Sequence, residues 1–346
     1  MPDSLVLYAP NVHTGGGLVL LRALLREWPA GLLLRAILDE RATDKISLPA
    51  QARVIWVQTT LASRFKAERQ LVAMAQPADT VLCFHGLPPL FRSAGRVVLF
   101  HQNRLLLGLM QLRDFPLRTG LRVAVERWIS RTFRHHVAEY IVQTPTMARA
   151  LTDWHGGSPK VTVLPFAQAF AARPRLTPVW DFVYVSDGLP HKNHARLLQA
   201  WVLLAAEGIR PRLALTIGPR DQVLADQVAG LVARKGVNIH NSGHIEHDEV
   251  LALYASAGAL VFPSLGESFG LPLIEARQAG LSILAPELDY VRDVCEPAQT
   301  FDPQSATSIA RAVKRFLQLA DPVPLPQPAG AFWAALGLFA GEKISK

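Results

Sequence analysis

Cysteine, charged residues and long hydrophobic runs are all scarce in this sequence. Two cysteines among 346 residues are too few for a disulfide scaffold or a four-cysteine zinc site. Charged residues make up 18% and hydrophobic residues 50%, which excludes a disordered chain, because such a chain lacks the apolar area that offsets ordering entropy. Arginines and a glutamate interrupt the leucine-rich segment 18–38, so no run reaches the ~18–20 apolar residues that span a bilayer. With no leader-like segment before the first strand-like run at 5–8, we expect a globular cytoplasmic protein of two domains.

Positive charge is concentrated in the first half of the chain. Residues 1–167 hold 20 Lys and Arg against 11 Asp and Glu, whereas residues 168–346 hold 16 and 17. The excess is densest where Arg118, Arg122, Arg127, Arg131 and Arg134 recur at helical spacing with apolar residues between them. A helix of this kind can lie on an anionic membrane surface, here the inner face of the cell membrane. The alternative is a helix packed on its own domain with a solvated arginine face.

Both halves alternate short β-rich runs with longer helical patterns, which is typical of parallel sheets with crossover helices. The predicted strands lie at 5–8, 54–58, 81–84, 97–100 and 140–143, and then at 182–185, 212–217, 237–240, 259–263 and 282–285. Helical patterns include 195–206, 248–257 and 305–320, and an apolar tail helix is predicted at 331–339.

This pattern predicts an α/β protein with two Rossmann-like domains. The predicted domains are 1–167 and 178–325, joined by a proline-containing linker at 168–177 and followed by a tail at 326–346. Such sheets bind ligands at the carboxyl ends of their strands.

The most informative stretch is 263–275, with the sequence PSLGESFGLPLIE. It leads from a predicted strand into a helix, and Pro272 suits the first helical turn. Gly266 and Gly270 allow the backbone to approach a ligand closely, and the free amides of the helix start form an anion site. Glu267 and Glu275 can both border that site. A nucleotide sugar supplies the phosphate and the hydroxyl groups that such a combination would bind.

This stretch resembles the Glu-x7-Glu motif of the retaining GT-B glycosyltransferases of the fourth family, the glycosyl transferases group 1. The resemblance extends over about residues 182–301. It implies that Glu267 contacts hydroxyls of the transferred sugar and that Glu275 binds the nucleotide ribose. It also implies that the loop amides of Ser268, Phe269, Gly270 and Leu271 meet the sugar and the diphosphate. The implied fold is GT-B, two Rossmann-like domains facing a cleft, with a C-terminal helix that returns to the N-terminal domain. An ordinary helix cap with a solvated Glu275 is the alternative.

The segment 184–193, YVSDGLPHKN, resembles the first strand and loop of the family's nucleotide domain. Lys192 matches the lysine that binds the donor diphosphate, where a cation stabilises the leaving group. The family often has an arginine shortly before this lysine, whereas this chain has Ser186 and Asp187. A second cation is therefore missing or comes from elsewhere, and Arg220 is a candidate. Asp187 would repel a diphosphate, so we expect it to turn away from the site or to meet the acceptor.

Two glycine-containing segments also resemble parts of the family's site. Gly15, Gly16 and Gly17 come between the first strand and a predicted helix at 18–28, where they would meet donor and acceptor across the cleft. A plain flexible turn is the alternative. Ile245, in the segment GHIEHDE, would pack on the nucleobase. The two histidines of that segment could instead suggest a metal cluster, but no third ligand follows at a convincing spacing, and we expect no metal.

Two histidines end predicted strands in the first half. His101 matches a family position where a histidine often contacts the transferred sugar near the reacting carbon. His85 has the weaker claim and is also interpreted as a structural histidine.

The resemblance implies a retaining glycosyltransferase of the hexosyltransferase type. It would move a sugar from a UDP- or GDP-linked donor to an acceptor hydroxyl by a same-face reaction, with no further cofactor. The basic first half favours a lipid-linked acceptor or an intermediate of polysaccharide or lipopolysaccharide synthesis. A nucleotide-sugar epimerase or a phosphorylase of the same architecture and a non-catalytic nucleotide-sugar-binding protein are alternatives. The pI near 9.8 also suggests a nucleic-acid-binding protein. Nucleic acid is not an expected partner, because that function leaves Glu267 and Glu275 unexplained.

Overall fold

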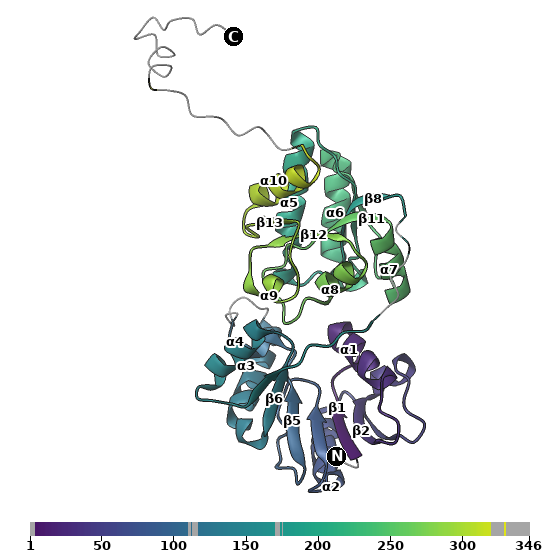
Figure 1. The fold of residues 1–346 in the computed structure, drawn as a ribbon, viewed down its shortest axis with the longest axis vertical. Coiled ribbons are helices and arrows are strands. Elements are labelled where there is room, and N and C mark those ends of the chain that lie inside the picture. Colours follow the sequence, from purple (N-terminus) through teal and green to yellow (C-terminus); the bar gives the residue numbers. More distant parts are fainter. Residues whose placement is uncertain are drawn as a thin grey trace, which may run out of the picture.

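The structure is a computed structural model that describes residues 4–109, 117–169 and 176–319, together with Leu112, Pro174 and Ala329. Two parallel sheets lie one beyond the other along the long axis of the molecule (Figure 1). We refer to each sheet with its helices as the first and the second domain. The chain passes from one sheet to the other between Val163 and Trp180. The domain limits given above stay a prediction.

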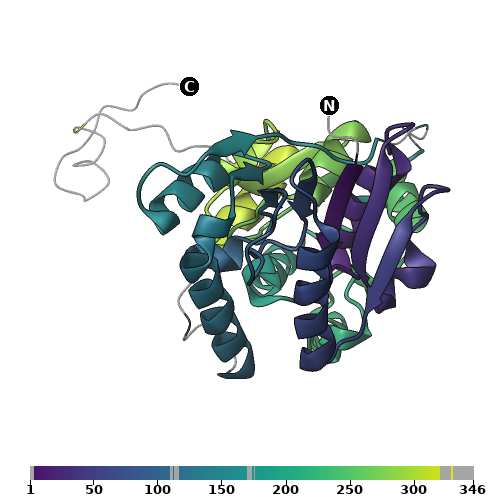
Figure 2. The same ribbon diagram turned by 90° about the horizontal axis from the view of Figure 1, so that it is seen from below.

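The first sheet has seven strands in the order β3-β2-β1-β4-β5-β6-β7. They are β1 (Ser4–Ala9), β2 (Leu33–Asp39), β3 (Arg53–Val57), β4 (Thr80–Cys83), β5 (Arg96–Phe100), β6 (Glu139–Val142) and β7 (Val161–Val163). The helices are α1 (Gly15–Arg26), α2 (Leu61–Met74), α3 (Leu117–Thr132) and α4 (Pro145–His155), with short 3₁₀ turns η1 (Glu40–Lys45), η2 (Arg104–Leu107) and η4 (Arg134–His136). In Figure 2, α2 and α3 stand on the same side of this sheet.

The second sheet repeats the same topology with six strands, in the order β10-β9-β8-β11-β12-β13. They are β8 (Trp180–Tyr184), β9 (Leu213–Leu215), β10 (Ile239–Asn241), β11 (Ala257–Val261), β12 (Ser282–Pro286) and β13 (Gln299–Phe301). The helices are α5 (His194–Ala206), α6 (Gln222–Lys235), α7 (His247–Ala255), α8 (Leu271–Gln278), α9 (Asp289–Arg292) and α10 (Ala306–Phe316), with 3₁₀ turns η5 (Pro190–Lys192) and η6 (Pro219–Asp221). In both sheets the order reverses beside the first strand, which is where doubly wound sheets bind ligands.

The two-sheet α/β architecture predicted from the sequence is confirmed. One local prediction is wrong: the three glycines do not form a loop before a helix at 18–28, because α1 begins at Gly15 and they make its first turn. The predicted tail at 326–346 and its helix fall outside the described residues except for Ala329. The last described helix, α10, packs on α5 of its own domain.

The carboxyl-terminal edges of the two sheets face each other, and side chains join the domains there. The amide of Thr146, at the start of α4, donates to Asp293 Oδ2 at 2.9 Å. Arg149 Nη2 lies 3.2 Å from Asp289 Oδ2. The amide of Arg104, at the start of η2, donates to Ser268 Oγ at 3.0 Å. The last contact holds the loops after β5 and β11 against each other, and the first two join α4 to the segment that follows β12.

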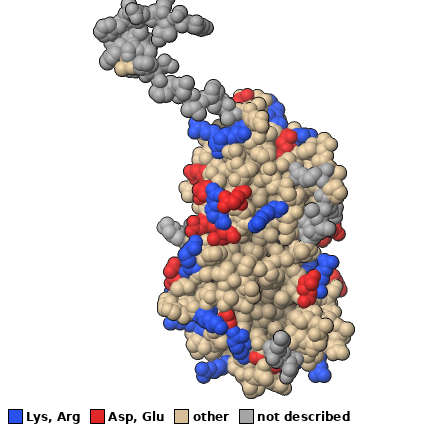
Figure 3. Space-filling view, in the orientation of Figure 1, with Lys and Arg blue, Asp and Glu red and all other residues tan. Residues whose placement is uncertain are grey.

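The surface is of mixed charge on the face shown in Figure 3, where acidic and basic side chains lie next to one another. The basic excess of the first half therefore forms no continuous patch on this face. Within the described ranges, no helix is both long enough and apolar enough to cross a bilayer.

Candidate active site

Lys192 and Glu267 form an ion pair at the carboxyl-terminal edge of the second sheet. Lys192 ends η5, which follows β8, and Glu267 lies in the loop that follows β11. Lys192 Nζ is 2.8 Å from Glu267 Oε1, and the side chains are only 14% and 12% exposed. Because β8 and β11 pair in parallel, their loops emerge side by side. Two residues that are 75 positions apart in the sequence are thereby brought together.

Several hydrogen bonds fix this pair. Ser264 Oγ donates to Glu267 Oε1 at 2.6 Å, and Tyr290 Oη donates to the carbonyl of Ser264 at 2.7 Å. Tyr184 Oη donates to the carbonyl of Lys192 at 2.7 Å. Preorganised charges of this kind stabilise a transition state without reorganisation during the reaction. The two tyrosines and the serine were not predicted from the sequence, because they have no motif of their own.

The start of α8 lies next to Glu267, because a Cβ on Gly270 would be 3.8 Å from the Cβ of Glu267. Gly270 is the N-cap with φ 71°, a left-handed conformation that suits glycine, and Pro272 lies in the first turn. Phe269 is buried in the core of the second domain, so only its backbone can bind a ligand. A Cβ on Gly16 would lie 3.2 Å from Leu271 Cδ1. The starts of α1 and α8 are therefore next to each other across the two domains (Figure 1).

Glu275 lies inside the second domain, one turn into α8. Tyr254 Oη donates to its Oε2 at 3.1 Å, and His247 Nδ1 is 3.9 Å from its Oε1. The side chain is 14% exposed, and burial raises the pKa of Glu275 to about 7. The alternative of a solvated Glu275 at an ordinary helix cap is therefore wrong.

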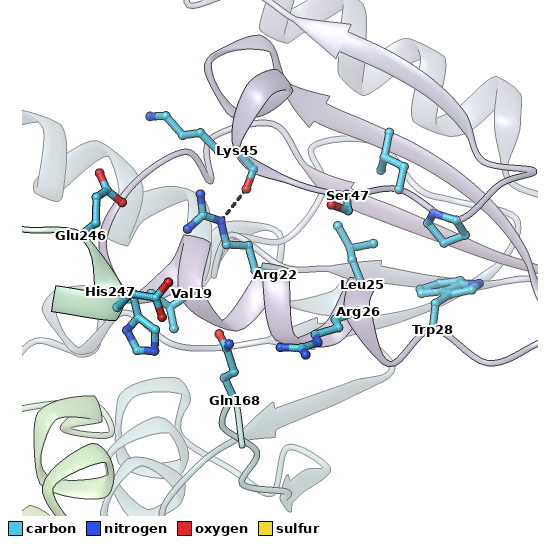
Figure 4. Close-up of a pocket in the computed structure, with 13 residues that line it drawn as sticks. Val19, Arg22, Leu25, Arg26, Trp28, Lys45, Ser47, Gln168, Glu246 and His247 are labelled. Atoms are coloured by element: carbon cyan, nitrogen blue, oxygen red, sulfur yellow. Dashed lines mark hydrogen bonds between the residues drawn. The ribbon is translucent and has the colours of Figure 1, made fainter. Parts of the chain in front are cut away.

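A pocket of about 820 Å³ opens between α1 and the start of α7. In Figure 4, Arg22 and Arg26 extend from α1 on one side, and Glu246 and His247 come from the second domain on the other. Because His247 also approaches Glu275, this pocket adjoins the predicted ribose position. Ile245, just before these residues, packs partly buried against the core of the second domain.

No group of three or more His, Cys, Asp or Glu side chains that could hold a metal ion occurs in the part of the chain that the structure describes. His247 faces Glu275, and the Cβ of His244 lies 3.2 Å from where a Cβ on Gly218 would be.

His101 is buried at the end of β5, with 1% of its surface exposed. Burial lowers the pKa of His101 to about 4, so the ring is neutral at pH 7. Its Nε2 has no hydrogen-bond partner among the described residues. A neutral imidazole can donate or accept a hydrogen bond, which fits the predicted contact with a sugar. His85 instead packs edge-on against the ring of Tyr8, with 5.1 Å between the ring centroids.

Asp187, which stands near where the family often has an arginine, and Arg220, the candidate for the second cation, are both exposed. Asp187 accepts a hydrogen bond from the amide of Leu189 at 3.5 Å. Arg220 belongs to η6, whose Asp221 accepts from the amide of Gly188 at 2.8 Å. Arg220 thus comes near the loop after β8, and its role stays a prediction.

Arg104 enters the site from the first domain and was not predicted from the sequence. Its guanidinium occupies the space where Gly266 lacks a side chain, beside Glu267. No pattern in the sequence connects Arg104 with the loop at 263–275.

Comparisons with known proteins show which sequences and folds this chain is similar to. Residues 169–325 match the family described as Glycosyl transferases group 1. The serotype-specific mannosyltransferase WbdA of Escherichia coli is 29% identical over 227 residues, which cover 60% of this chain and 26% of WbdA. The O-antigen chain mannosyltransferase B of E. coli is 32% identical over 141 residues, which cover 39% of this chain and 36% of that protein. This chain thus spans about a quarter to a third of the length of these relatives.

A solved structure, Anabaena Alr3699/HepE in complex with UDP and glucose, superposes with a TM-score of 0.63 at 14% identity. The match covers 91% of this chain and 90% of that one. At this identity the likeness shows the fold alone, which is the GT-B arrangement expected from the sequence.

Proposed function

We propose that this chain, whose residues 169–325 match the glycosyl transferases group 1 family, is a retaining glycosyltransferase that uses a nucleotide-diphosphate sugar. The observation that carries the proposal is the Lys192–Glu267 pair beside the starts of two helices. A lysine and free helix amides suit a diphosphate, and a carboxylate suits sugar hydroxyls. Glu275, about one turn further along α8, would then accept hydrogen bonds from the ribose.

The proposed reaction needs no nucleophile from the protein. The bond between the anomeric carbon and the diphosphate oxygen breaks, and the acceptor oxygen bonds to the same face of that carbon. The acceptor proton passes to the departing phosphate oxygen. Lys192 and the amides at the start of α8 would hold the charge that develops on the leaving diphosphate. Neutral His101 would hydrogen-bond the sugar.

The names of the relatives suggest the substrates to try first. Both reported relatives are mannosyltransferases, and one acts on an O-antigen chain by its name. We therefore propose mannose as the first donor sugar to test and a polysaccharide or lipid-linked intermediate of lipopolysaccharide synthesis as the acceptor. UDP and GDP are both candidates for the nucleotide.

The surface of α3 supports a peripheral membrane location for this reaction. Leu117, Leu121, Val125 and Trp128 are 92%, 69%, 48% and 61% exposed, and they follow one side of the helix. Val123 is fully buried and faces the opposite way. The outward side of α3 therefore carries apolar side chains as well as arginines, which the sequence did not lead us to expect. Exposed apolar side chains flanked by arginines suit the interface of an anionic membrane.

The decisive experiment offers UDP- and GDP-linked sugars, with and without saccharide acceptors, and follows product by mass spectrometry and anomeric configuration by NMR. Transfer with retained configuration supports the proposal. Exchange of the donor sugar's configuration without an acceptor would identify an epimerase, and binding without turnover would identify a non-catalytic binder. Lys192→Ala should lower turnover more than donor affinity, whereas Lys235→Ala, an exposed lysine at the end of α6, should change neither.

A further inference from the structure

Arg104 is held at the junction of the domains by contacts on both sides. It begins η2, where the side chain of Asn103 accepts a hydrogen bond from the amide of Leu105 at 3.1 Å. The amide of Arg104 itself donates to Ser268 Oγ of the second domain at 3.0 Å. The backbone of Arg104 is therefore fixed against the loop that carries Glu267.

The guanidinium of Arg104 occupies a space that exists only because residue 266 is glycine. A Cβ built on Gly266 would overlap the Arg104 guanidinium. Burial lowers the pKa of Arg104, while nearby Tyr290 and Glu267 act in the opposite direction. Within the described ranges, the guanidinium has no hydrogen-bond or ion-pair partner.

The charges around this point do not balance. Glu267 already pairs with Lys192, so Arg104 adds a second cation to a site with one carboxylate. A partly buried charge without a partner is unfavourable, so the arrangement favours an anion. The planar guanidinium offers parallel N–H donors that match two phosphate oxygens.

We propose that Arg104 is the second cation of the donor-diphosphate site, supplied by the first domain in place of the arginine that is missing at 186–187. The inference rests on the proposed function and assigns one further residue to it. Lys192 comes from the second domain and Arg104 from the first. The leaving diphosphate is therefore fully neutralised only when both domains meet, which couples domain closure to transfer and disfavours loss of the donor to water.

Calorimetric binding of nucleotides tests this assignment. The probe is whichever of UDP and GDP binds the wild-type protein more tightly, together with the matching nucleoside monophosphate. Arg104→Gln should weaken diphosphate binding by ~10- to 100-fold and monophosphate binding much less, because the substitution removes a charged hydrogen bond to the terminal phosphate. Arg104→Lys should recover part of the affinity.

Gly266→Ala gives an independent test that leaves the arginine in place. The added methyl group would displace the flexible guanidinium, so this variant should also weaken diphosphate binding. The double variant with Arg104→Gln should bind little more weakly than either single variant, since both changes act on the same interaction. Arg92→Gln, which changes an exposed arginine before β5, is the control and should bind the diphosphate as the wild type does, and Arg220→Gln tests the competing candidate from the sequence.

The following results would overturn the assignment. Unchanged diphosphate affinity in folded Arg104→Gln removes Arg104 from the site, and weaker binding by Arg220→Gln instead identifies Arg220 as the second cation. If Arg104→Gln binds the diphosphate normally and only its KM for a phosphate-bearing acceptor is raised, Arg104 binds the phosphate of the acceptor and not that of the donor. If the wild-type protein binds neither UDP nor GDP, the proposed function itself fails. That failure differs from failure of the Arg104 assignment, because it is seen in the wild type and not only in a variant.

Discussion

Glu275 should make the empty protein less stable as the pH rises, and Glu275→Gln should remove that effect. Burial raises the pKa of Glu275 from 4.5 to about 7, so the folded protein binds this proton more tightly than the unfolded chain does. Its contribution to stability is therefore fully present below about pH 4.5 and is lost as the pH rises to about 7. At ~1.4 kcal/mol for each factor of ten in proton affinity, the loss amounts to about 3 kcal/mol.

Denaturant unfolding from pH 4.5 to 8.5 measures this difference directly. The free energy of unfolding of Glu275→Gln, relative to wild type, should rise by about 3 kcal/mol between pH 4.5 and pH 7 and then stay level. Glu27→Gln is the control, because Glu27 is an exposed glutamate at the C-cap of α1, and it should show no such trend. A pH-independent difference for Glu275→Gln would refute the reasoning, because a buried carboxyl must titrate differently in the two states.

Binding of the donor nucleotide should show the complementary dependence. Ribose hydroxyls that donate to Glu275 favour its ionised form, so binding should tighten as the pH rises through about 7 and should release a proton. In Glu275→Gln this part of the pH dependence should disappear. Calorimetry in buffers of different ionisation enthalpy counts the released protons. If the wild type releases no proton on binding at pH 6, Glu275 does not contact the nucleotide.

Two further changes test the membrane surface and the domain junction. The double variant Leu121→Ser, Trp128→Ser should lose most of its sedimentation with vesicles that contain anionic lipid, whereas Val223→Ser, which removes an apolar side chain 76% exposed on α6, should not. Equal sedimentation of all three proteins at every lipid composition and salt concentration would contradict membrane binding by α3. Gly16→Val should lower turnover at least tenfold with little change in melting temperature, because the valine side chain would meet Leu271 across the junction. A fully active Gly16→Val would show that turnover does not require the close approach of the starts of α1 and α8.

The strands that could be predicted are those with clear boundaries in the sequence. The ten predicted strands all correspond to observed ones, within a few residues. β2 was not predicted because it follows α1 within one leucine-rich segment and is largely buried, so it shows no alternation that separates it from a helix. The three-residue strands β7 and β13 were not predicted either.

The same distinction applies to the site. Glu267 and Glu275 were singled out because one short segment carries the loop, the helix start and both carboxylates, and their roles stay a prediction. Lys192 could be predicted from its loop, but its contact with Glu267 depends on the parallel pairing of β8 and β11. Arg104 could not be found, because only the approach of two domains brings it to Gly266, and no local pattern encodes that approach.

Three buried ionisable groups at this junction have pKa values that are shifted so that the charged form is disfavoured. Burial raises the pKa of Glu275 and lowers the pKa values of His101 and Arg104. A purely structural interface would favour apolar side chains here, because uncompensated polar groups reduce stability. Three such groups from two domains, next to the Lys192–Glu267 pair, are the arrangement expected where binding and catalysis require tuned ionisation. A nucleotide sugar supplies hydroxyls for Glu275, a hydrogen-bonding partner for His101 and phosphate oxygens for Arg104, so a single ligand would satisfy all three.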